Sequence, residues 1–345
     1  MKLKVTISNI ILVFFSLLIV FLILELLSRI FVNFEADYYA ASKKNKDNFI
    51  LHPYGKIPLN KDGFFDTEFN FKDKKKIVAY FGDSVTYGVG AGYPYRFTEY
   101  LDEIDDKFEH INLSGGLGIS LNSWNAKHEI FLSENNIKRI VYMMNLNDIA
   151  PLSNSFLKDK KQNTKVKNIN LLRSFINPLD NLLRGQSVFY TYVRFLIKKQ
   201  FVKAGYEASG YESIELFPEK NKNHLINASR KIEEWLRLTK EKGFKSCVVV
   251  LPYEMQISKN AKDYYRSINI KFEDDFTNFS TQKFLKKNLK DDKNFFFINN
   301  DGFKEKKVGS YFVFNKGDKI DFNHPNRLGH LIIAKEIYKK KICQK

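Results

Sequence analysis

The sequence is poor in cysteine, with only Cys247 and Cys343 among its 345 residues. Two cysteines are too few for the disulfide framework of a small secreted scaffold, and neither stands at a metal-binding spacing. Cys247 lies in an apolar run, where a small core residue is the simplest interpretation, and a single bridge between the two cysteines stays open. The chain also lacks an HExxH motif, so we expect no metal ion.

The sequence also lacks the motifs of nucleotide-binding proteins and the nucleophile-elbow motif of α/β-hydrolases. The glycines Gly88, Gly90 and Gly92 follow a predicted strand, but their spacing matches neither GxGxxG nor GxxxxGK[ST]. The chain has no GxSxG nucleophile elbow, which argues against the conventional α/β-hydrolase fold. We therefore expect no cofactor.

Acidic residues are outnumbered by basic ones. There are 56 Lys and Arg and 39 Asp and Glu, which gives a formal net charge of +17 and an isoelectric point near 9.5. This excess favours acidic partners such as anionic lipid or acidic polysaccharide. The lysines are scattered without a nucleic-acid-binding motif, so we expect no nucleic acid partner, and a lysine-rich solvated surface is an equally good interpretation. Nothing in the sequence indicates an oligomeric state.

Charge is absent from Val5 to Leu24, a run dominated by Ile, Leu, Val and Phe. A helix of this length spans about 30 Å, the thickness of a bilayer's hydrocarbon core. A cleaved signal peptide is the competing interpretation, but bulky residues continue from Leu26 to Phe31, and Tyr38 to Ser42 is a poor cleavage site. We predict one uncleaved transmembrane helix in an N-terminal anchor of residues 1–32. Basic residues lie on both sides of the run, so charge alone does not set its topology.

Short apolar runs alternate with helical patterns through residues 76–345. The predicted strands are Ile77–Phe81, His110–Leu113, Ile137–Met144, Lys245–Leu251 and Phe295–Asn299, and the predicted helices include Leu121–Leu132, Asn223–Lys242, Phe272–Leu289 and Asn326–Lys340. Such alternation predicts a parallel sheet with helices on both faces, which is a three-layer α/β/α domain.

Two segments depart from this alternation. Residues 33–75 are polar with scattered aromatics and turn-forming Pro58 and Gly63, and we assign them as a connector packed on the domain. Residues 151–220 form an insertion longer than an ordinary connection, with a predicted helix from Ser187 to Val202. Three interpretations of this helix are open: a lid over the active site, a helix resting on the membrane, and, as the favoured one, a helix packed on its own domain.

Gly82, Asp83 and Ser84 follow directly on the first predicted strand, so the serine stands at the carboxyl edge of the sheet, where function in open α/β sheets gathers. A serine hydroxyl becomes an effective nucleophile when a base takes its proton. Asp321 precedes His324 by three residues, close enough for the carboxylate to hold one ring nitrogen while the other faces Ser84. We predict Ser84 as nucleophile, His324 as general base and Asp321 as the group that orients the imidazole.

Four blocks of sequence occur in the order typical of one family: Gly82-Asp83-Ser84, Gly115-Gly116-Leu117-Gly118, Asn145-Leu146-Asn147-Asp148 and Asp321-Phe322-Asn323-His324-Pro325-Asn326. With these blocks the chain resembles the SGNH, or GDSL-type, hydrolases over roughly residues 50 to 340. The resemblance implies a flavodoxin-like α/β/α fold, a Ser-His-Asp triad, and an oxyanion hole made by the backbone N–H groups of Ser84 and Gly118 and the side-chain amide of Asn147.

The sequence departs from the family pattern at one position and leaves one alignment choice. Asn145 stands where the family has glycine, with a narrower pocket or an additional polar group in it as the two possible consequences. The choice of Gly118 rests on aligning Gly115 and Gly118 with the usual spacing. Asp83 is interpreted as a structural residue of the turn, and the remaining histidines as structural or surface residues.

These features predict a membrane-anchored serine esterase at the bacterial cell envelope. Its expected reaction is the removal of acyl groups, most simply acetyl groups, from acylated carbohydrate or small ester substrates. The resemblance favours a catalytic domain outside the cytoplasm. The alternatives are an O-acyltransferase acting on cell-surface polysaccharide through the same acyl-enzyme, and a catalytically idle glycan-binding or assembly protein. The natural substrate and its acyl chain length do not follow from the sequence.

Overall fold

The chain divides into two compact units by its internal contacts. One unit comprises residues 1–42 and 163–206, and the other comprises residues 43–162 and 207–345. The structure, a computed structural model, describes residues 2–31, 43–44, 49–52, 55–71, 76–115, 120–124, 126–153, 183, 187–203, 214–267, 270–304, 306–313 and 321–344. The described part of the predicted insertion is therefore split between the two units.

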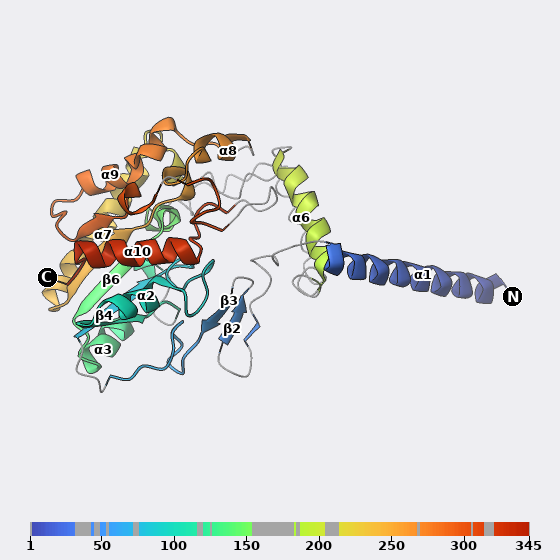
Figure 1. Ribbon diagram of the computed structural model, residues 1–345, viewed down its shortest axis with the longest axis horizontal. Coiled ribbons are helices and arrows are strands. Elements are labelled where there is room, and N and C mark those ends of the chain that lie inside the picture. The colour runs from blue at the N-terminus through green and yellow to red at the C-terminus, as the bar shows by residue number, and fades with distance from the viewer. Residues whose placement is uncertain are drawn as a thin grey trace. The chain divides into compact units, whose positions relative to one another are not determined.

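The first unit contains two helices, α1 (Lys2–Phe31) and α6 (Val188–Lys203), which contact each other (Figure 1). The stretch Ile11–Phe31 of α1 has a mean hydropathy of 2.9, is almost entirely unburied, and is long and apolar enough to cross a membrane. Within the described residues no other helix has this character. The predicted N-terminal apolar helix is thus present, and its length and composition fit an anchor or a signal sequence.

The second unit is built on a five-stranded parallel sheet. Its strands are β4 (Lys76–Gly82), β5 (Phe108–Asn112), β6 (Arg139–Met144), β7 (Lys245–Val250) and β8 (Phe295–Phe297). Their order across the sheet is β5-β4-β6-β7-β8. Numbered along the chain, this is the order 2-1-3-4-5 of flavodoxin-like folds, in which ligands bind at the carboxyl ends of the strands where the order reverses. Here that switch point lies between β4 and β6.

Alternate residues of each strand point to opposite sides of this sheet. Both faces are therefore apolar, and helices pack on each of them. In β4, Phe81 belongs to one apolar cluster and Tyr80 to the other. The cluster of Phe81 includes residues of α3 (Ala126–Glu134) and α7 (Lys222–Glu241), and the cluster of Tyr80 includes residues of α2 (Phe97–Ile104) and α10 (Arg327–Lys340) (Figure 1). The predicted three-layer α/β/α fold with a parallel sheet is confirmed.

The remaining helices of the described residues are short. They are α4 (Ile149–Leu152), α8 (Ala261–Ser267), α9 (Ser280–Lys287) and the 3-10 turns Leu121–Ser123, Leu146–Asp148, Ile214–Leu216, Glu254–Gln256, Asp274–Asn278 and Asn300–Gly302. The prediction of a single helix over 272–289 is wrong. Phe279 adopts a left-handed φ of 60° between the 3-10 turn Asp274–Asn278 and α9, which divides the segment in two. The Phe279 ring is buried and stacks on Phe297 of β8, so tertiary packing overrides the helical pattern there.

The helix predicted over 121–132 also differs from the structure. It begins as the 3-10 turn Leu121–Ser123 and continues as α3 from Ala126, with the sharp turn closed by hydrogen bonds between Ser120 and Ser123. Serine side chains compete for backbone groups in this way, which shortens the regular helix.

The segment before β4 forms a small antiparallel sheet and then contacts the large one. The small sheet consists of β1 (Lys43–Lys44), β2 (Phe49–His52) and β3 (Gly55–Pro58). After it, the backbone N–H of Phe65 donates to Ser114 O at 2.9 Å, and the backbone N–H of Tyr93 donates to Lys56 O at 2.8 Å. The described part of residues 33–75 is therefore hydrogen-bonded to the loops around the sheet.

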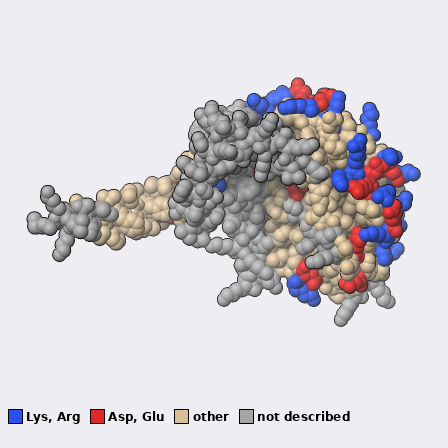
Figure 2. Space-filling view, turned by 180° about the vertical axis from the view of Figure 1, so that it is seen from behind, with Lys and Arg blue, Asp and Glu red and all other residues tan. Residues whose placement is uncertain are grey.

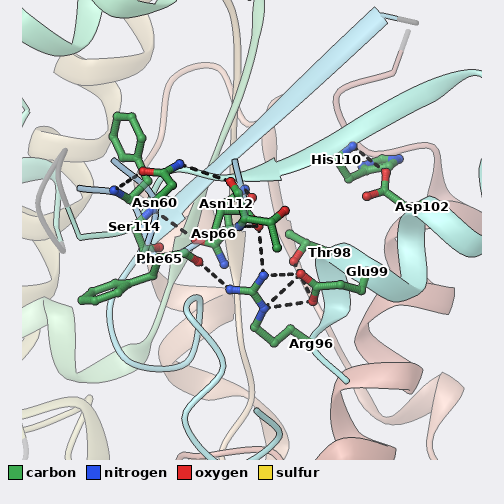
Figure 3. A network of polar contacts seen from close by, with 12 residues as sticks. Asn60, Phe65, Asp66, Arg96, Thr98, Glu99, Asp102, His110, Asn112 and Ser114 are labelled. Atoms are coloured by element: carbon green, nitrogen blue, oxygen red, sulfur yellow. Dashed lines mark hydrogen bonds and ion pairs between the residues drawn. The ribbon is translucent and has the colours of Figure 1, made fainter. Parts of the chain in front are cut away.

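A buried arginine holds this contact in place. Arg96, immediately before α2, has no exposed surface, pairs with Glu99, and places its Nη2 3.1 Å from Asp66 Oδ1 (Figure 3). The second carboxylate oxygen of Asp66 accepts from the backbone N–H of Asn112 at 2.6 Å, and Arg96 also donates to the carbonyl of Phe65. The ion pair thus joins the connecting segment, the end of β5 and the start of α2.

The two cysteines form a disulfide. Cys247 on β7 and Cys343 after the end of α10 are bridged, with their Cα atoms 5.8 Å apart. The bridge ties the C-terminal segment to the middle of the sheet, which resolves the alternative that the sequence leaves open.

Candidate active site

The turn that carries Ser84, the predicted nucleophile, begins where β4 ends. Gly82 closes the strand, and a Cβ at this position would collide with Met143 O of β6 and Thr86 Oγ1, so no other residue fits without a shift. The turn that follows is closed by the backbone N–H of Thr86, which donates to Asp83 O at 2.9 Å. This geometry leaves Ser84 partly exposed at the carboxyl edge of the sheet, beside the switch point between β4 and β6.

Ser84, His324 and Asp321 form a continuous hydrogen-bonded chain. Ser84 Oγ lies 2.8 Å from His324 Nε2, and His324 Nδ1 lies 2.9 Å and 3.0 Å from the two carboxylate oxygens of Asp321. Because an ionised carboxylate can only accept, Nδ1 carries the proton and donates, which leaves Nε2 to accept from the serine hydroxyl. The structure brings together the three residues that the sequence predicts, across a separation of 240 positions.

The imidazole of His324 is kept neutral. Burial lowers the pKa of His324 to about 3. A neutral imidazole is the form that can take a proton from a hydroxyl, so the geometry and the protonation state agree with general-base chemistry at neutral pH.

The loop that carries Asp321 is fixed by a second buried carboxylate, Glu254, which follows β7. Glu254 has no exposed surface and accepts from Tyr265 OH at 2.5 Å, from Ser258 Oγ at 3.2 Å and from the backbone N–H of Gly309 at 2.5 Å. Its own backbone N–H donates to Phe322 O at 2.8 Å. Neither Glu254 nor Tyr265 is predicted from the sequence as part of the site, and the one local signal is the position of Glu254 just after a strand.

The other end of the same loop is held by the cap of α10. The side chain of Asn326 accepts from the backbone N–H of Gly329 at 3.1 Å and donates to the carbonyls of Ser310 and Phe312 at 3.2 Å and 3.1 Å. A Cβ on Gly329 would collide with Tyr311 O, so glycine is required in this first turn. His324 is therefore bracketed by Glu254 on one side and by a capped helix on the other.

Asn145 stands where the family that this sequence resembles has glycine. Its side chain points into the protein and not into an open pocket. It is 1% exposed, and its Nδ2 donates to Asp83 Oδ2 at 3.1 Å. Its backbone N–H donates to Asp148 Oδ2 at 3.1 Å, and the same oxygen accepts from Tyr142 OH at 2.7 Å. Asn145 thus links the nucleophile turn after β4 with the loop after β6.

Three buried acids lie in this network. Burial raises the pKa of Asp83 to about 6, against hydrogen bonds from the backbone of Val85 and from Asn145 that lower it. Burial and the charge of Asp83 raise the pKa of Asp148 well above its ordinary value. Burial raises the pKa of Glu215, which accepts from Tyr253 OH at 3.1 Å, to about 7. Asp83 is therefore both a residue of the turn and a titratable neighbour of Ser84.

The predicted oxyanion donors are described in part. Asn147 is half-buried and hydrogen-bonded to Asp83, and its Oδ1 has no partner among the described residues. Its NH₂ group has two hydrogens, so one stays available for a substrate oxygen while the other serves Asp83. Gly118 lies outside the described residues.

Other titratable clusters do not form a metal site. Within the described ranges, no group of three or more His, Cys, Asp or Glu side chains is arranged to hold a metal ion.

His330 of α10 accepts from the backbone N–H of Phe97 at 3.2 Å and stacks on its ring, and burial lowers its pKa to about 3. His330 is therefore a buried neutral residue next to the site.

The fold and this edge of the sheet define a flavodoxin-like α/β protein with a hydrogen-bonded Ser-His-Asp chain. No protein-family model matches the sequence, and no curated protein matches it. Among solved structures the chain is similar to the crystal structure of an acetyl xylan esterase, with 12% sequence identity and a TM-score of 0.38 over 76% of this chain and 98% of that one. A likeness this remote carries no information about the reaction, which has to be inferred from the site itself.

Proposed function

We propose that the chain is a serine esterase of the SGNH type. The observation that carries the proposal is the hydrogen-bonded chain from Ser84 Oγ through His324 to Asp321, with the imidazole neutral. In this mechanism Ser84 Oγ attacks the acyl carbonyl while His324 Nε2 takes its proton, and Asp321 stabilises the imidazolium that forms. The same proton then leaves with the alcohol. Water, deprotonated by His324, then attacks the acyl-enzyme, and His324 returns that proton to Ser84 Oγ as the acid leaves.

The negative charge that develops on the carbonyl oxygen needs fixed donors. We propose the backbone N–H groups of Ser84 and Gly118 and the side-chain amide of Asn147 for this role. Loss of one such donor commonly raises the barrier by about 3 kcal/mol. The position of Asn147 after β6, next to the nucleophile turn after β4, supports its assignment.

For the substrate we propose an acetyl ester, carried by carbohydrate or by a small alcohol. The four sequence blocks and their resemblance to an esterase family support this class. An acyltransferase would pass through the same acyl-enzyme and differ only in the acceptor, so the experiment below includes a glycan acceptor.

For the location we propose a single N-terminal anchor with the catalytic unit outside the cytoplasm. The unburied apolar stretch Ile11–Phe31 supports the anchor, because a core helix of a soluble protein would be covered by its own domain. The Cys247–Cys343 disulfide supports the external location, because disulfides persist in oxidising compartments.

The test is labelling of the detergent-solubilised full-length protein with a fluorophosphonate probe. We expect the parent to be labelled, and Ser84→Ala and His324→Ala to lose at least 99% of the labelling. Ser267→Ala, which removes an exposed serine of α8, is the matched control and should label like the parent.

Hydrolysis of a chromogenic acetyl ester should follow the same pattern. Absence of labelling in well-folded parent protein would contradict the esterase and favour a binding protein. Labelling with transfer of the acetyl group to an added glycan, detected by mass spectrometry, would instead identify an acyltransferase.

A further inference from the structure

The apolar helix α1 carries an acidic residue that finds its partners on α6. Between Ile11 and Phe31 the charged residues are Glu25 and Arg29, and Arg29 Nε donates to Glu25 Oε1 at 2.7 Å. The carboxylate also accepts from Ser187 Oγ at 2.6 Å and from the backbone N–H groups of Val188 and Phe189 at 3.1 Å and 3.0 Å. A carboxylate inside an apolar membrane segment is costly unless it is partnered, and these donors supply the partners.

The same contact satisfies the start of α6. The first N–H groups of a helix have no acceptor within the helix, and here Glu25 accepts from two of them. Ser187 Oγ accepts from the backbone N–H of Tyr190 at 3.0 Å, and one turn before Glu25 the ring of Phe21 packs edge-on against Phe189 with centroids 5.9 Å apart. Glu25 of α1 therefore accepts from N–H groups that have no acceptor within α6, and these N–H groups in turn supply hydrogen bonds to the carboxylate. Both helices belong to one compact unit.

The position of Glu25 sets the depth of this contact. Glu25 lies six residues before Phe31, the end of α1, and at about 1.5 Å per residue this corresponds to about 9 Å. If α1 spans a bilayer, the start of α6 lies near the boundary between the acyl chains and the headgroups.

The composition of α6 fits a lipid surface. Its sequence, VFYTYVRFLIKKQFVK, has four basic residues and no acidic one, with apolar and aromatic residues throughout. Leu196 and Ile197 are 37% and 51% exposed. At the interface of a membrane that contains anionic lipid, a helix gains from burying exposed apolar side chains and from the attraction of its basic residues to the lipid.

We propose that α6 is a second membrane-contacting element, which Glu25 ties to the anchor and which lies in the interface of a bilayer containing anionic phospholipid. This inference rests on the proposed anchor and is independent of the proposed esterase chemistry. Its occupant is the lipid bilayer, argued from the continuity of α6 with the apolar helix that enters the bilayer.

The test places a fluorescent NBD label on Ile197→Cys in the full-length protein, reconstituted into vesicles of phosphatidylcholine and phosphatidylglycerol at 3:1. The matched position is Leu238→Cys on α7, which has a comparable exposure of 39%. We expect quenching by a lipid with a nitroxide near the headgroup to be at least threefold stronger at position 197 than at position 238. Glu25→Ala should bring position 197 down to the level of position 238, whereas Ser16→Ala, an exposed change on α1 away from α6, should leave it unchanged.

Other outcomes would overturn the proposal. Quenching of position 197 by aqueous iodide as strong as at position 238 would place α6 in water, and protection from both quenchers would mean that protein, from this chain or a second copy, covers it. Failure of the protein to float with the vesicles would contradict the anchor and the α6 contact together. Fluorophosphonate labelling in the same vesicles reports the esterase separately, so its loss with intact lipid quenching would contradict only the catalytic proposal.

Discussion

Asn145 bridges two buried carboxyls through its side-chain amide and its backbone N–H. Its Nδ2 donates to Asp83 and its backbone N–H to Asp148, so the residue before the nucleophile and the loop of Asn147 are fixed relative to each other. A glycine could keep the backbone bond but would lose the bond to Asp83. Since the pKa of His324 is lowered to about 3 by burial, the group expected to titrate near neutral pH beside Ser84 is Asp83, with a pKa of about 6.

This arrangement predicts a pH dependence that Asn145 controls. Below its pKa, Asp83 is protonated and accepts more weakly from Val85 N and Asn145 Nδ2, so fluorophosphonate labelling of Ser84 should fall as the pH drops through about 6. Asn145→Gly removes a donor that stabilises the ionised form, which raises the pKa of Asp83. We expect the midpoint to move upward by about one to two pH units, since a hydrogen bond to a charged group contributes about 1.5–3 kcal/mol.

The measurement is the labelling rate of the solubilised protein between pH 4.5 and 8.5. Asn288→Ala, which removes an exposed asparagine at the end of α9, is the control and should leave the midpoint unchanged. A lower labelling rate in Asn145→Gly with the parent's midpoint would mean that Asn145 is only structural.

At the scale of elements, the segment before β4 depends on one buried cation. The charges of Glu99 and Asp66 raise the pKa of Arg96 against a burial effect that would lower it, so the guanidinium stays charged in the interior. Removing it would leave the Asp66 carboxyl, which is 6% exposed, and the partly buried Glu99 without their cation. Breaking a buried pair in this way costs far more than the pair contributes on balance.

We predict that Arg96→Met lowers the free energy of unfolding by about 3–5 kcal/mol. The matched change is Arg237→Met on α7, which breaks an exposed ion pair with Glu241 and should cost less than about 1 kcal/mol. Denaturant unfolding followed by tryptophan fluorescence measures both, because Trp124 and Trp235 pack in the cluster on one face of the sheet. Equal effects of the two substitutions would contradict a structural role for the buried pair.

At the scale of the whole molecule, the charge of the described residues is mixed in sign on the face that Figure 2 shows. Figure 2 shows Lys and Arg interspersed with Asp and Glu on the visible face, and α7 alone carries the exposed pairs Lys231–Glu234 and Arg237–Glu241. Such pairs are neutral together and contribute nothing to the net charge of +17, which is the excess of basic over acidic residues. This distribution gives little support on that face to a single-sign patch of the kind that nucleic acid requires.

The disulfide is a long-range covalent constraint, since it joins residues 96 positions apart. A bridge that closes a loop of this length reduces the entropy of the unfolded chain. In the simple loop model this stabilises the folded state by about 4–5 kcal/mol, and in practice often by less. We predict that the double variant Cys247→Ala with Cys343→Ala lowers the free energy of unfolding by about 2–4 kcal/mol.

Addition of a reductant should lower the unfolding midpoint of the parent and leave the double variant unchanged. Thermal or denaturant unfolding with and without dithiothreitol measures this difference. A parent that is insensitive to reductant under conditions that release two free thiols would show that the bridge contributes nothing to stability.

The sequence by itself predicted most of the strands and helices and named the candidate residues of the site. Runs such as Ile77–Phe81 are apolar and strand-forming by local composition, and the spacing of Asp321 and His324 is local as well. The alternation of strands and helices predicted the three layers because hydrophobic periodicity reflects burial. In the same way, the long apolar N-terminal run predicted α1.

Only the tertiary structure decided what depends on contacts between distant parts of the chain. The strand order puts β6 beside β4 and so brings Asn145 to Asp83, and packing against Phe297 breaks the helical pattern at Phe279. The clamp on the Asp321 loop by Glu254 and the bond of Glu25 to Ser187 are equally nonlocal. Such contacts join residues whose own neighbours carry no signal of the partner, so local patterns cannot predict them.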